Sequence, residues 1–507
     1  MIDLRPMRIG LVDGLRRLAS DAFSGTPSRR LALGLLLAYV LAAPFPWGSV
    51  QPGLTGTGKI TAGAFLVALA AFASPDVRLR LDGLAAPLAA FSGLALLGFV
   101  QAAPLPAGLV RAVSPHSAEA WDGAGRVLAA FDRPAPAARF SLAPWETAGV
   151  ALLVLAFAAL FLAASVLLAR RAARRLFGLA ILASALLQVA IAVSSDDRST
   201  RLHASFVNPN HLAGYLELAI PFALGLIWYA SRTSLSELLA TSSADERSER
   251  IVSALPSVAA AVVLLGVLVA GVVLTQSRGG ILAVGGGTLV YVSLAFGVRR
   301  DASRARRAAG AILALLVVLG TAFAIAGAGT VAFLRFLLPD AADLAGDFRL
   351  LIWKDSLSAF ARFPWLGSGL GTFRESIRAV QSPLVTGLVD QAHDEYLQIL
   401  VTGGLAGALL GAAALFLGLR AFLRALREQR HREESAFGLA GLGALVFLLL
   451  HGVAEFNFSI PAIPATLAAC LGGAWAALAW HRSDEPEAAF SEGREPERRR
   501  RSRPEPA

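Results

Sequence analysis

The feature that most constrains this chain is a series of apolar runs, each close to the length that crosses a bilayer. A transmembrane helix needs about 20 consecutive, mostly apolar residues. Because a lipid-exposed segment must satisfy its backbone hydrogen bonds internally, each run is expected to be a helix. The sequence therefore predicts an all-α, polytopic membrane protein with about twelve transmembrane helices. The runs lie at residues 31–47, 60–74, 83–101, 147–168, 176–194, 212–230, 254–275, 280–297, 309–334, 396–418, 436–455 and 460–480.

Composition argues against the alternative of a soluble helical protein. The 507 residues are 56% hydrophobic and only 16% charged. A soluble protein carries about 25% charged residues, so this chain has too few to cover a water-facing surface. The single cysteine, Cys470, lies inside an apolar run and rules out an intramolecular disulfide framework. The sequence contains neither a P-loop nor a dinucleotide fingerprint, which argues against a nucleotide-driven pump and a nicotinamide enzyme.

The positive charges are distributed unequally between the two sides of the predicted bundle. The N-terminal segment 1–30, the tail 481–507 and the connections on their side hold 32 of the 46 Lys and Arg residues. Cytoplasmic connections of membrane proteins are enriched in positive residues, so both termini are predicted to be cytoplasmic. The N-terminal segment has the pattern of a short amphipathic interfacial helix. The tail is rich in Pro, Glu and Arg and is predicted to be disordered.

One connection is long, polar and mixed in charge. Residues 335–395 separate nine predicted helices in 31–334 from three in 396–480. A loop of this length is too long to be a mere connector. It is predicted to lie on the external side, where the other polar connections also lie. We expect it to carry the active-site residues.

Arg278 is a candidate anion-binding residue. It lies in the segment Thr275–Gly280, between two apolar runs that have almost no loop between them. An arginine at that depth is costly unless it is paired or faces an aqueous cavity. Its planar fork suits bidentate binding of phosphate oxygens, and the glycines that follow would let a ligand approach the backbone. The alternative is an interfacial arginine that snorkels from a tight turn.

The external connection before the sixth run carries several candidate substrate-binding residues. Arg201 is a second candidate for an anion contact. His203 flanks the Asn-Pro-Asn sequence formed by Asn208 to Asn210, which suits a helix N-cap as well as it suits a binding site. Glu217 is a carboxylate inside the run and is expected to face the bundle interior or a cavity. It either forms a structural pair with an arginine or belongs to the site.

The long loop carries the candidate catalytic base. Arg349 and Lys354 lie in a segment patterned like an interfacial helix, where they either contact substrate or snorkel. His393 closes the loop where the next helix enters the membrane, beside Asp394 and Glu395. Imidazole exchanges protons near neutral pH, which suits a general base. The rival interpretation is that His393 only orients the helix start and that a neighbouring carboxylate is the base.

The eleventh run ends in a polar segment. His451 and Glu455 are four residues apart, so they are predicted to share one helix face and to pair with each other or with an arginine. No metal site is predicted. Asp340, Asp343 and Asp347 have helical spacing, but they are more typical of a helix start or a solvated face than of a metal cage.

Five motifs in a fixed order resemble the O-antigen ligase and polymerase superfamily of bacterial envelope glycosyltransferases. The resemblance runs from about residue 200 to residue 480, and the long external loop agrees with it. The motifs are Phe206–Tyr215, Thr275–Gly280, Arg349–Trp353 followed by Pro364–Gly369, His393–Gln398 followed by Gly403–Gly407, and His451–Pro461.

The resemblance implies a function and a set of partners. The expected reaction is transfer of a glycan from an undecaprenyl-diphosphate carrier to an acceptor hydroxyl, such as that of lipid A-core, at the periplasmic face of the bacterial inner membrane. The resemblance also implies a C-type glycosyltransferase-like fold and no required metal or nucleotide cofactor. Arg278, with Arg201 or Arg349, would stabilise the diphosphate as charge develops. His393 would be the base, and displacement at the anomeric carbon would invert its configuration.

Two other functions remain open from the sequence. A polymerase would use the same donor chemistry but would extend a growing lipid-linked glycan. A twelve-helix transporter or flippase would show repeated halves and broken helices at mid-membrane, whereas this chain has its polar motifs on one side. No nucleic-acid partner is expected, because the positive charge follows the predicted topology.

Overall fold

The fold of the chain was described from a computed structural model, which covers residues 5–45, 47–49, 54–75, 82–195, 201–240, 244–297 and 348–479. Within these ranges the regular elements are helices, and no strand occurs among them. The prediction of an all-α protein is therefore confirmed. The predicted helix at 309–334 and the tail 481–507 lie outside the described residues.

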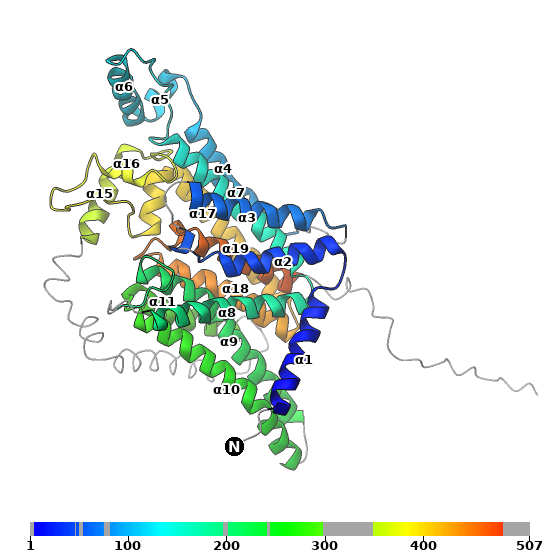
Figure 1. Cartoon of the computed structure of the whole chain (residues 1–507). Coiled ribbons are helices and arrows are strands. Elements are labelled where there is room, and N and C mark those ends of the chain that lie inside the picture. Colours follow the sequence, from blue (N-terminus) through cyan, green and yellow to red (C-terminus); the bar gives the residue numbers. More distant parts are fainter. Residues whose placement is uncertain are drawn as a thin grey trace, which may run out of the picture.

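The described helices keep the numbering of Figure 1. Two short 3₁₀ turns, η1 (Trp47–Ser49) and η2 (Asn457–Ser459), lie between them. The α-helices are α1 (Arg5–Ala22), α2 (Pro27–Ala42), α3 (Leu54–Phe72), α4 (Ala85–Ala102), α5 (Ala107–Val113), α6 (Pro115–Ala129), α7 (Pro144–Leu167), α8 (Arg171–Ser194), α9 (Pro209–Ala240), α10 (Ala244–Leu274), α11 (Arg278–Gly297), α15 (Arg349–Arg362), α16 (Phe373–Ile377), α17 (Glu395–Glu428), α18 (Arg432–His451) and α19 (Ala462–Ala479).

Nine helices in the described ranges are long and apolar enough to cross a membrane. They coincide with nine of the twelve predicted runs, so the chain is a polytopic membrane protein. Two further runs form shorter helices. The helix α2 ends at Ala42, just before Pro44, and the apolar part of α3 covers only Thr57–Phe72. Proline cannot continue a helix interior, which explains why the first run is shorter than its hydropathy indicates.

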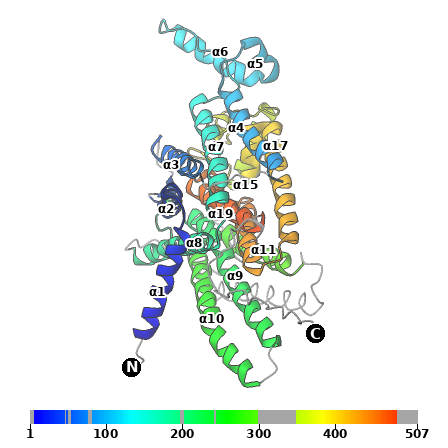
Figure 2. The ribbon, with the colours of Figure 1, turned by 90° about the vertical axis from the view of Figure 1, so that its right-hand side faces the viewer.

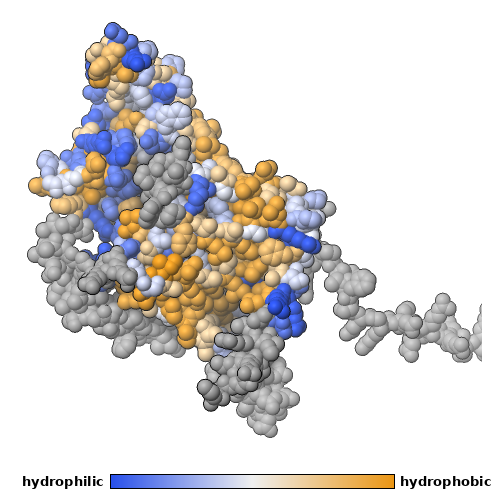
Figure 3. Space-filling view, viewed as in Figure 1, coloured by the Kyte–Doolittle hydropathy of each residue, from blue (hydrophilic) through white to orange (hydrophobic). Residues whose placement is uncertain are grey.

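The helices α9, α18 and α19 form the centre of the bundle. In the most apolar segments of α9, α18 and α19, 83%, 72% and 89% of the residues are buried. The buried share is 28% or less in the corresponding segments of α4, α10 and α17. The hydrophobic surface that the outer helices leave exposed covers much of the described bundle, and hydrophilic side chains gather toward α15 and α16 (Figure 3). Polar side chains on the central helices cannot reach water and must find partners inside the protein.

The helices alternate in direction, so their polar connections gather at two opposite ends. The loop end comprises residues 201–208, 275–278, 348–395 and 452–459, which exchange hydrogen bonds with one another. The basic end comprises residues 22–30, 167–175 and 429–435, which also contact one another. In Figure 1, α15 and α16 mark the loop end and the junction of α1 with α2 marks the basic end. The helices α5 and α6 extend beyond α4 and α7, as Figure 2 shows.

The described part of the long loop is clamped onto α17. The helix α17 breaks at Gly404, whose φ of 62° lies outside the helical region. Residues 364–369 fill the break, where the N–H groups of Leu405 and Ala406 donate to Pro364 and Trp365, and those of Ser368 and Gly369 donate to Val401 and Thr402. A break inside a membrane helix is tolerated only when the freed backbone groups find other partners. The loop supplies those partners and is thereby fixed in place.

Glycine and one buried amide make the clamp feasible. A Cβ on Gly367 would lie 2.2 Å from the carbonyl oxygen of Thr402, so no other residue fits there. The amide of Gln101 on α4 donates to the carbonyl groups of Leu366 and Thr402 and accepts from the N–H of Leu370. The Pro-Trp-Leu-Gly-Ser-Gly motif and the paired glycines of α17 are therefore the two halves of one packing contact.

Candidate functional site

A buried carboxylate, Glu455, is the centre of a polar cluster at the loop end. Only 2% of its side chain is exposed. Its Oε1 accepts hydrogen bonds from Nη2 of Arg349 and from Nδ2 of Asn210, and its Oε2 lies 3.4 Å from Nδ1 of His393. Three residues predicted for the site, from segments far apart in the sequence, therefore meet at one carboxylate.

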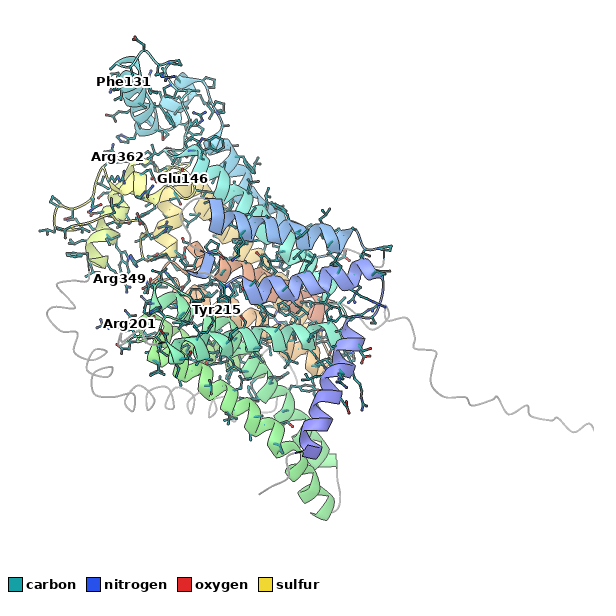
Figure 4. The ribbon with its side chains drawn as sticks, in the orientation of Figure 1. Phe131, Glu146, Arg201, Tyr215, Arg349 and Arg362 are labelled. Carbon is teal, nitrogen blue, oxygen red and sulfur yellow. The ribbon has the colours of Figure 1, made fainter. Side chains whose placement is uncertain are left out.

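Arg201 joins this cluster through Asn210. Its Nη2 donates to Oδ1 of Asn210 over 2.7 Å, and its Nε donates to the carbonyl oxygen of Thr275 over 3.0 Å. The amide of Asn210 thus bridges an arginine and Glu455. Figure 4 shows Arg201 and Arg349 at the same end of the molecule. Both arginines are partly exposed.

Arg278 is the first residue of α11, directly after the turn that Arg201 contacts. It is partly exposed, and the helix N-terminus that it opens favours an anion because its first N–H groups lack partners within the helix. Gln276, two residues before Arg278, has a φ of 54°. Residues other than glycine held in this region cost about 1–3 kcal/mol and cluster at functional sites. Arg201 and Arg278 thus border one strained turn.

The two glycines after Arg278 serve packing between helices. A Cβ on Gly279 would lie 2.9 Å from Cδ2 of His451, and one on Gly280 would lie 2.9 Å from the Cβ of Ala213. They let the start of α11 approach α18 and α9. Close packing of helices is therefore one reason for these glycines, and a ligand's approach to their backbone stays a prediction.

His393 has the most unusual setting of the predicted site residues. Its φ is 52°, its ring meets the ring of Phe456 edge to face with centroids 4.8 Å apart, and 29% of its side chain is exposed. The two carboxylates beside it are committed to backbone groups. Asp394 caps α17 by accepting from the N–H groups of Tyr396 and Leu397, and Oε1 of Glu395 accepts from the N–H of Phe458. This geometry favours His393 over either carboxylate as a base.

The electrostatics of the cluster keep Glu455 ionised. Burial by itself would raise the pKa of Glu455, but the hydrogen bond from His393 and the charge of Arg349 outweigh burial and bring this pKa below its usual range. The pKa of Asp394 moves in the opposite direction, because burial outweighs its two backbone hydrogen bonds. A charged Glu455 holds Nδ1 of His393 as the donor, which leaves Nε2 as the nitrogen that can accept a proton.

Glu217 and His451 form a second, deeper pair. Both side chains have no exposed surface, and Nδ1 of His451 lies 2.9 Å from Oε1 of Glu217, within ion-pair range but not aligned as a hydrogen bond. The helix α18 ends at His451, so Glu455 lies beyond the helix and the predicted shared face does not exist. Glu455 pairs with Arg349, whereas His451 pairs with Glu217. Burial of both residues favours a supporting role over contact with substrate.

The remaining predicted residues lie around the cluster. Oδ1 of Asn208 accepts from the N–H of Asn210 at the start of α9, so Asn208 serves as the helix cap that its sequence allows. His203 lies within 3.0 Å of the carbonyl oxygen of Phe206 and closes the turn of its own loop. Lys354 lies on the exposed face of α15 and contributes no contact to Glu455.

The central place of Glu455 and of the groups around it was not predicted from the sequence. Glu455 was treated only as a partner for His451 or an arginine, and Phe456, Ser277 and Gln101 were not singled out. An acidic residue in an otherwise apolar hairpin was the available signal, because such a residue requires a partner. Within the described ranges, no group of three or more His, Cys, Asp or Glu side chains could hold a metal ion.

Comparison with known proteins agrees with the motifs. Residues 259–412 match a family model described as O-Antigen ligase. No curated protein matches the chain. The matched range contains Arg278, Arg349 and His393, and it supports the O-antigen ligase and polymerase superfamily that the motifs resemble.

Proposed function

We propose that this protein transfers a glycan from an undecaprenyl-diphosphate carrier to an acceptor hydroxyl of lipid A-core. The observation that carries the proposal is the cluster around Glu455, which joins His393, Arg349 and, through Asn210, Arg201 at one end of a membrane bundle. The cluster combines a base with cations, which are the two kinds of group that this transfer requires. The O-Antigen ligase match over residues 259–412 supports the same reaction class.

The arginines would bind the diphosphate of the donor. Diphosphate is already a competent leaving group, so catalysis needs positive charge where negative charge develops rather than a strong acid. Arg278 and Arg201 border the same turn, and Arg349 lies across Glu455 from Asn210. In this proposal the three guanidinium groups provide the charge, and the reaction needs no metal ion.

His393 would activate the acceptor hydroxyl. Glu455 holds Nδ1 of His393, so Nε2 can take the proton of the hydroxyl as its oxygen attacks the anomeric carbon. The oxygen–carbon bond forms while the bond to the diphosphate breaks, and the electron pair leaves with the diphosphate. A single displacement of this kind inverts the anomeric configuration.

The direct test uses the full chain reconstituted in lipid nanodiscs with a lipid-diphosphate-linked glycan. We expect the glycan to appear on lipid A-core when that acceptor is added, and Arg278→Ala to abolish the product. A glycan extended on a second lipid-linked donor would instead identify a polymerase. Absence of transfer to either acceptor by protein that binds the donor would refute the proposed reaction.

The proposed site is periplasmic and both termini are cytoplasmic. The 32 of 46 positive residues on the terminal side support this orientation in the inner membrane. Reporter fusions after Val389 and after Ala488 should lie in opposite compartments. The same compartment for both fusions would contradict the topology without bearing on the chemistry.

A further inference from the structure

The pair formed by Glu217 and His451 has no place in the proposed chemistry, although it lies directly behind the site. Both side chains have no exposed surface. Neither oxygen of Glu217 receives a hydrogen bond from the described residues. Breaking such a buried pair costs several kcal/mol, and well-packed apolar residues are often at least as stable. Stability alone is therefore a weak reason for the pair, and its contacts point to another role.

The pair supports the turn that carries Arg278. Nε2 of His451 lies 3.3 Å from Oγ of Ser277, and the same Oγ accepts from the N–H of Gly280 over 3.2 Å. Ser277 thus caps α11 and connects its first turn to the imidazole. A Cβ placed on Gly280 would lie 3.2 Å from Oε1 of Glu217, so the carboxylate also rests against this turn.

The Thr275–Gly280 turn connects the Glu217–His451 pair to the cluster around Glu455. The hydroxyl of Thr275 accepts from the N–H of Ser277, and the carbonyl oxygen of Thr275 accepts from Nε of Arg201. Arg201 then contacts Asn210, which contacts Glu455. A continuous series of contacts therefore runs from the fully buried Glu217–His451 pair through residues 275–280 to Arg278 and Arg201.

We propose that Glu217 and His451 are positioning residues that hold the strained Thr275–Gly280 turn, and with it Arg278 and Arg201, in the geometry that binds the donor diphosphate. The proposal rests on the proposed function, because it assigns to the pair the orientation of the diphosphate site. Glu217 holds the imidazole from α9. The imidazole fixes the Ser277 hydroxyl from α18, and that hydroxyl fixes the start of α11.

The proposal predicts a defect in donor binding rather than in turnover. Arginine recognition of phosphate depends on the direction of its hydrogen bonds. Loosening the turn should therefore weaken binding of undecaprenyl diphosphate by about tenfold, the loss expected when a charge-assisted hydrogen bond is misaligned. The turnover number at saturating donor should change much less, because His393 and Glu455 are untouched.

The experiment compares Glu217→Gln, His451→Gln and Ser277→Ala in the full chain reconstituted in nanodiscs. Binding of undecaprenyl diphosphate is measured directly, and KM for the donor and kcat are measured with the glycan-linked donor. Tyr215→Phe is the matched control, since it removes a buried hydroxyl on the same helix α9 that is bonded to Ser184 on α8 and not to the Thr275–Gly280 turn. It should leave both binding and turnover unchanged.

We expect a raised KM and weaker probe binding in all three variants, with kcat nearly retained. If Glu217→Gln or His451→Gln fails to fold, Ser277→Ala decides, because it removes only the link between the pair and the turn. Wild-type probe affinity in stable Ser277→Ala protein would overturn the proposal. Arg278→Ala separates the proposed donor site from the proposed positioning role. If probe binding is lost in Arg278→Ala but normal in Ser277→Ala, only the positioning role is rejected. Normal binding in Arg278→Ala would reject the proposed donor site itself.

Discussion

The two ends of α18 use the same residue types for different purposes. At the basic end, two carboxylates meet three arginines. One of these, Arg174, and a fourth arginine, Arg29, also donate to the carbonyl groups of Leu168 and Leu167 at the end of α7, where a positive charge is favourable. The ion pairs there are Glu433 with Arg175, and Glu434 with Arg171 and Arg174.

At the loop end, just beyond α18, one carboxylate has three partners of different chemical types. Glu455 meets one arginine, one histidine and one amide, and the arginine and the histidine remain about one-third exposed. The backbone differs as well. Ala204, Gln276 and His393 have positive φ at the loop end although none is a glycine, whereas Gly25 is the positive-φ residue in the described part of the basic end. Strained backbone and a histidine among the partners therefore distinguish the loop end, where we propose the site, from the basic end, where the ion pairs join helices.

The largest expected effect is on catalysis at the loop end. His393→Asn should lower the rate of glycan transfer by about 10³-fold, the middle of the range for a general base. Asparagine tolerates positive φ better than alanine, so the helix start should survive. Transfer kinetics and donor binding are measured together, and binding should persist because the arginines are unchanged. A rate near that of the wild type would mean that His393 is not the base.

Glu455→Gln should lower transfer by about 10²-fold, the usual loss when one partner of a buried charge pair is removed. The pH dependence provides a second readout. Because the pKa of Glu455 is lowered in the folded protein, its stabilising contribution is present above the unfolded pKa and is lost as the pH falls through the folded pKa. Thermal unfolding of the variant should therefore lose part of the acid dependence seen in the wild type. Identical profiles would argue against an ionised Glu455.

Arg278→Lys should lower transfer by about 30-fold, since the charge remains but the bidentate geometry, worth roughly 2 kcal/mol, is lost. Insertion and thermal stability should be unchanged, because Arg278 is partly exposed at a helix start. The measurement is kcat/KM for the donor, with Arg278→Ala as the more severe comparison. Equal activity of the lysine variant and the wild type would indicate that only charge matters at this position.

Much of the bundle could be predicted from the sequence, because apolar length alone identifies a membrane helix. The nine spans and the segregation of polar motifs at one end follow from hydropathy. The clamp of residues 364–369 in the break of α17 could not be predicted, because it depends on hydrogen bonds between backbone groups far apart in the sequence. The bond from Ser368 to Val401 spans 33 residues, and the bond from Leu405 to Pro364 spans 41. The glycine motifs marked its two halves without indicating that they touch.

Individual residues of the candidate site could be predicted from the sequence, but the contacts that join them could not. His393, Arg349, Arg201 and Asn210 were each identified from local pattern. Glu455, which joins them, was expected from helical spacing to share a face with His451 and to pair with it or with an arginine. That spacing failed because α18 ends at His451, and a turn sends the two side chains to different partners. Periodicity predicts shared faces only while the helix continues.

At the basic end the expected loss is in stability. Glu434→Gln should destabilise the protein by about 2 kcal/mol, below the usual cost of breaking a buried pair because Arg171 is 38% exposed. Glycan transfer at a temperature where the variant remains folded should be unchanged. Thermal unfolding and activity are measured on the same preparation. A loss of activity without a loss of stability would mean that the two ends are coupled, and it would contradict a purely structural role for the basic end.

The smallest effect is expected at the neighbouring carboxylate. Glu433 forms a bidentate contact with Arg175, through Nε at 2.7 Å and Nη2 at 2.6 Å, but 54% of the Arg175 side chain is exposed. An exposed pair of this kind is worth about 0.5 kcal/mol, and salt screens it. Glu433→Gln should therefore lower thermal stability only slightly at low ionic strength and not measurably at about 1 M salt, where the Debye length falls to roughly 3 Å. A shift as large as that of Glu434→Gln, persisting at high salt, would show that the exposed pair is as deeply coupled to the bundle as the buried one.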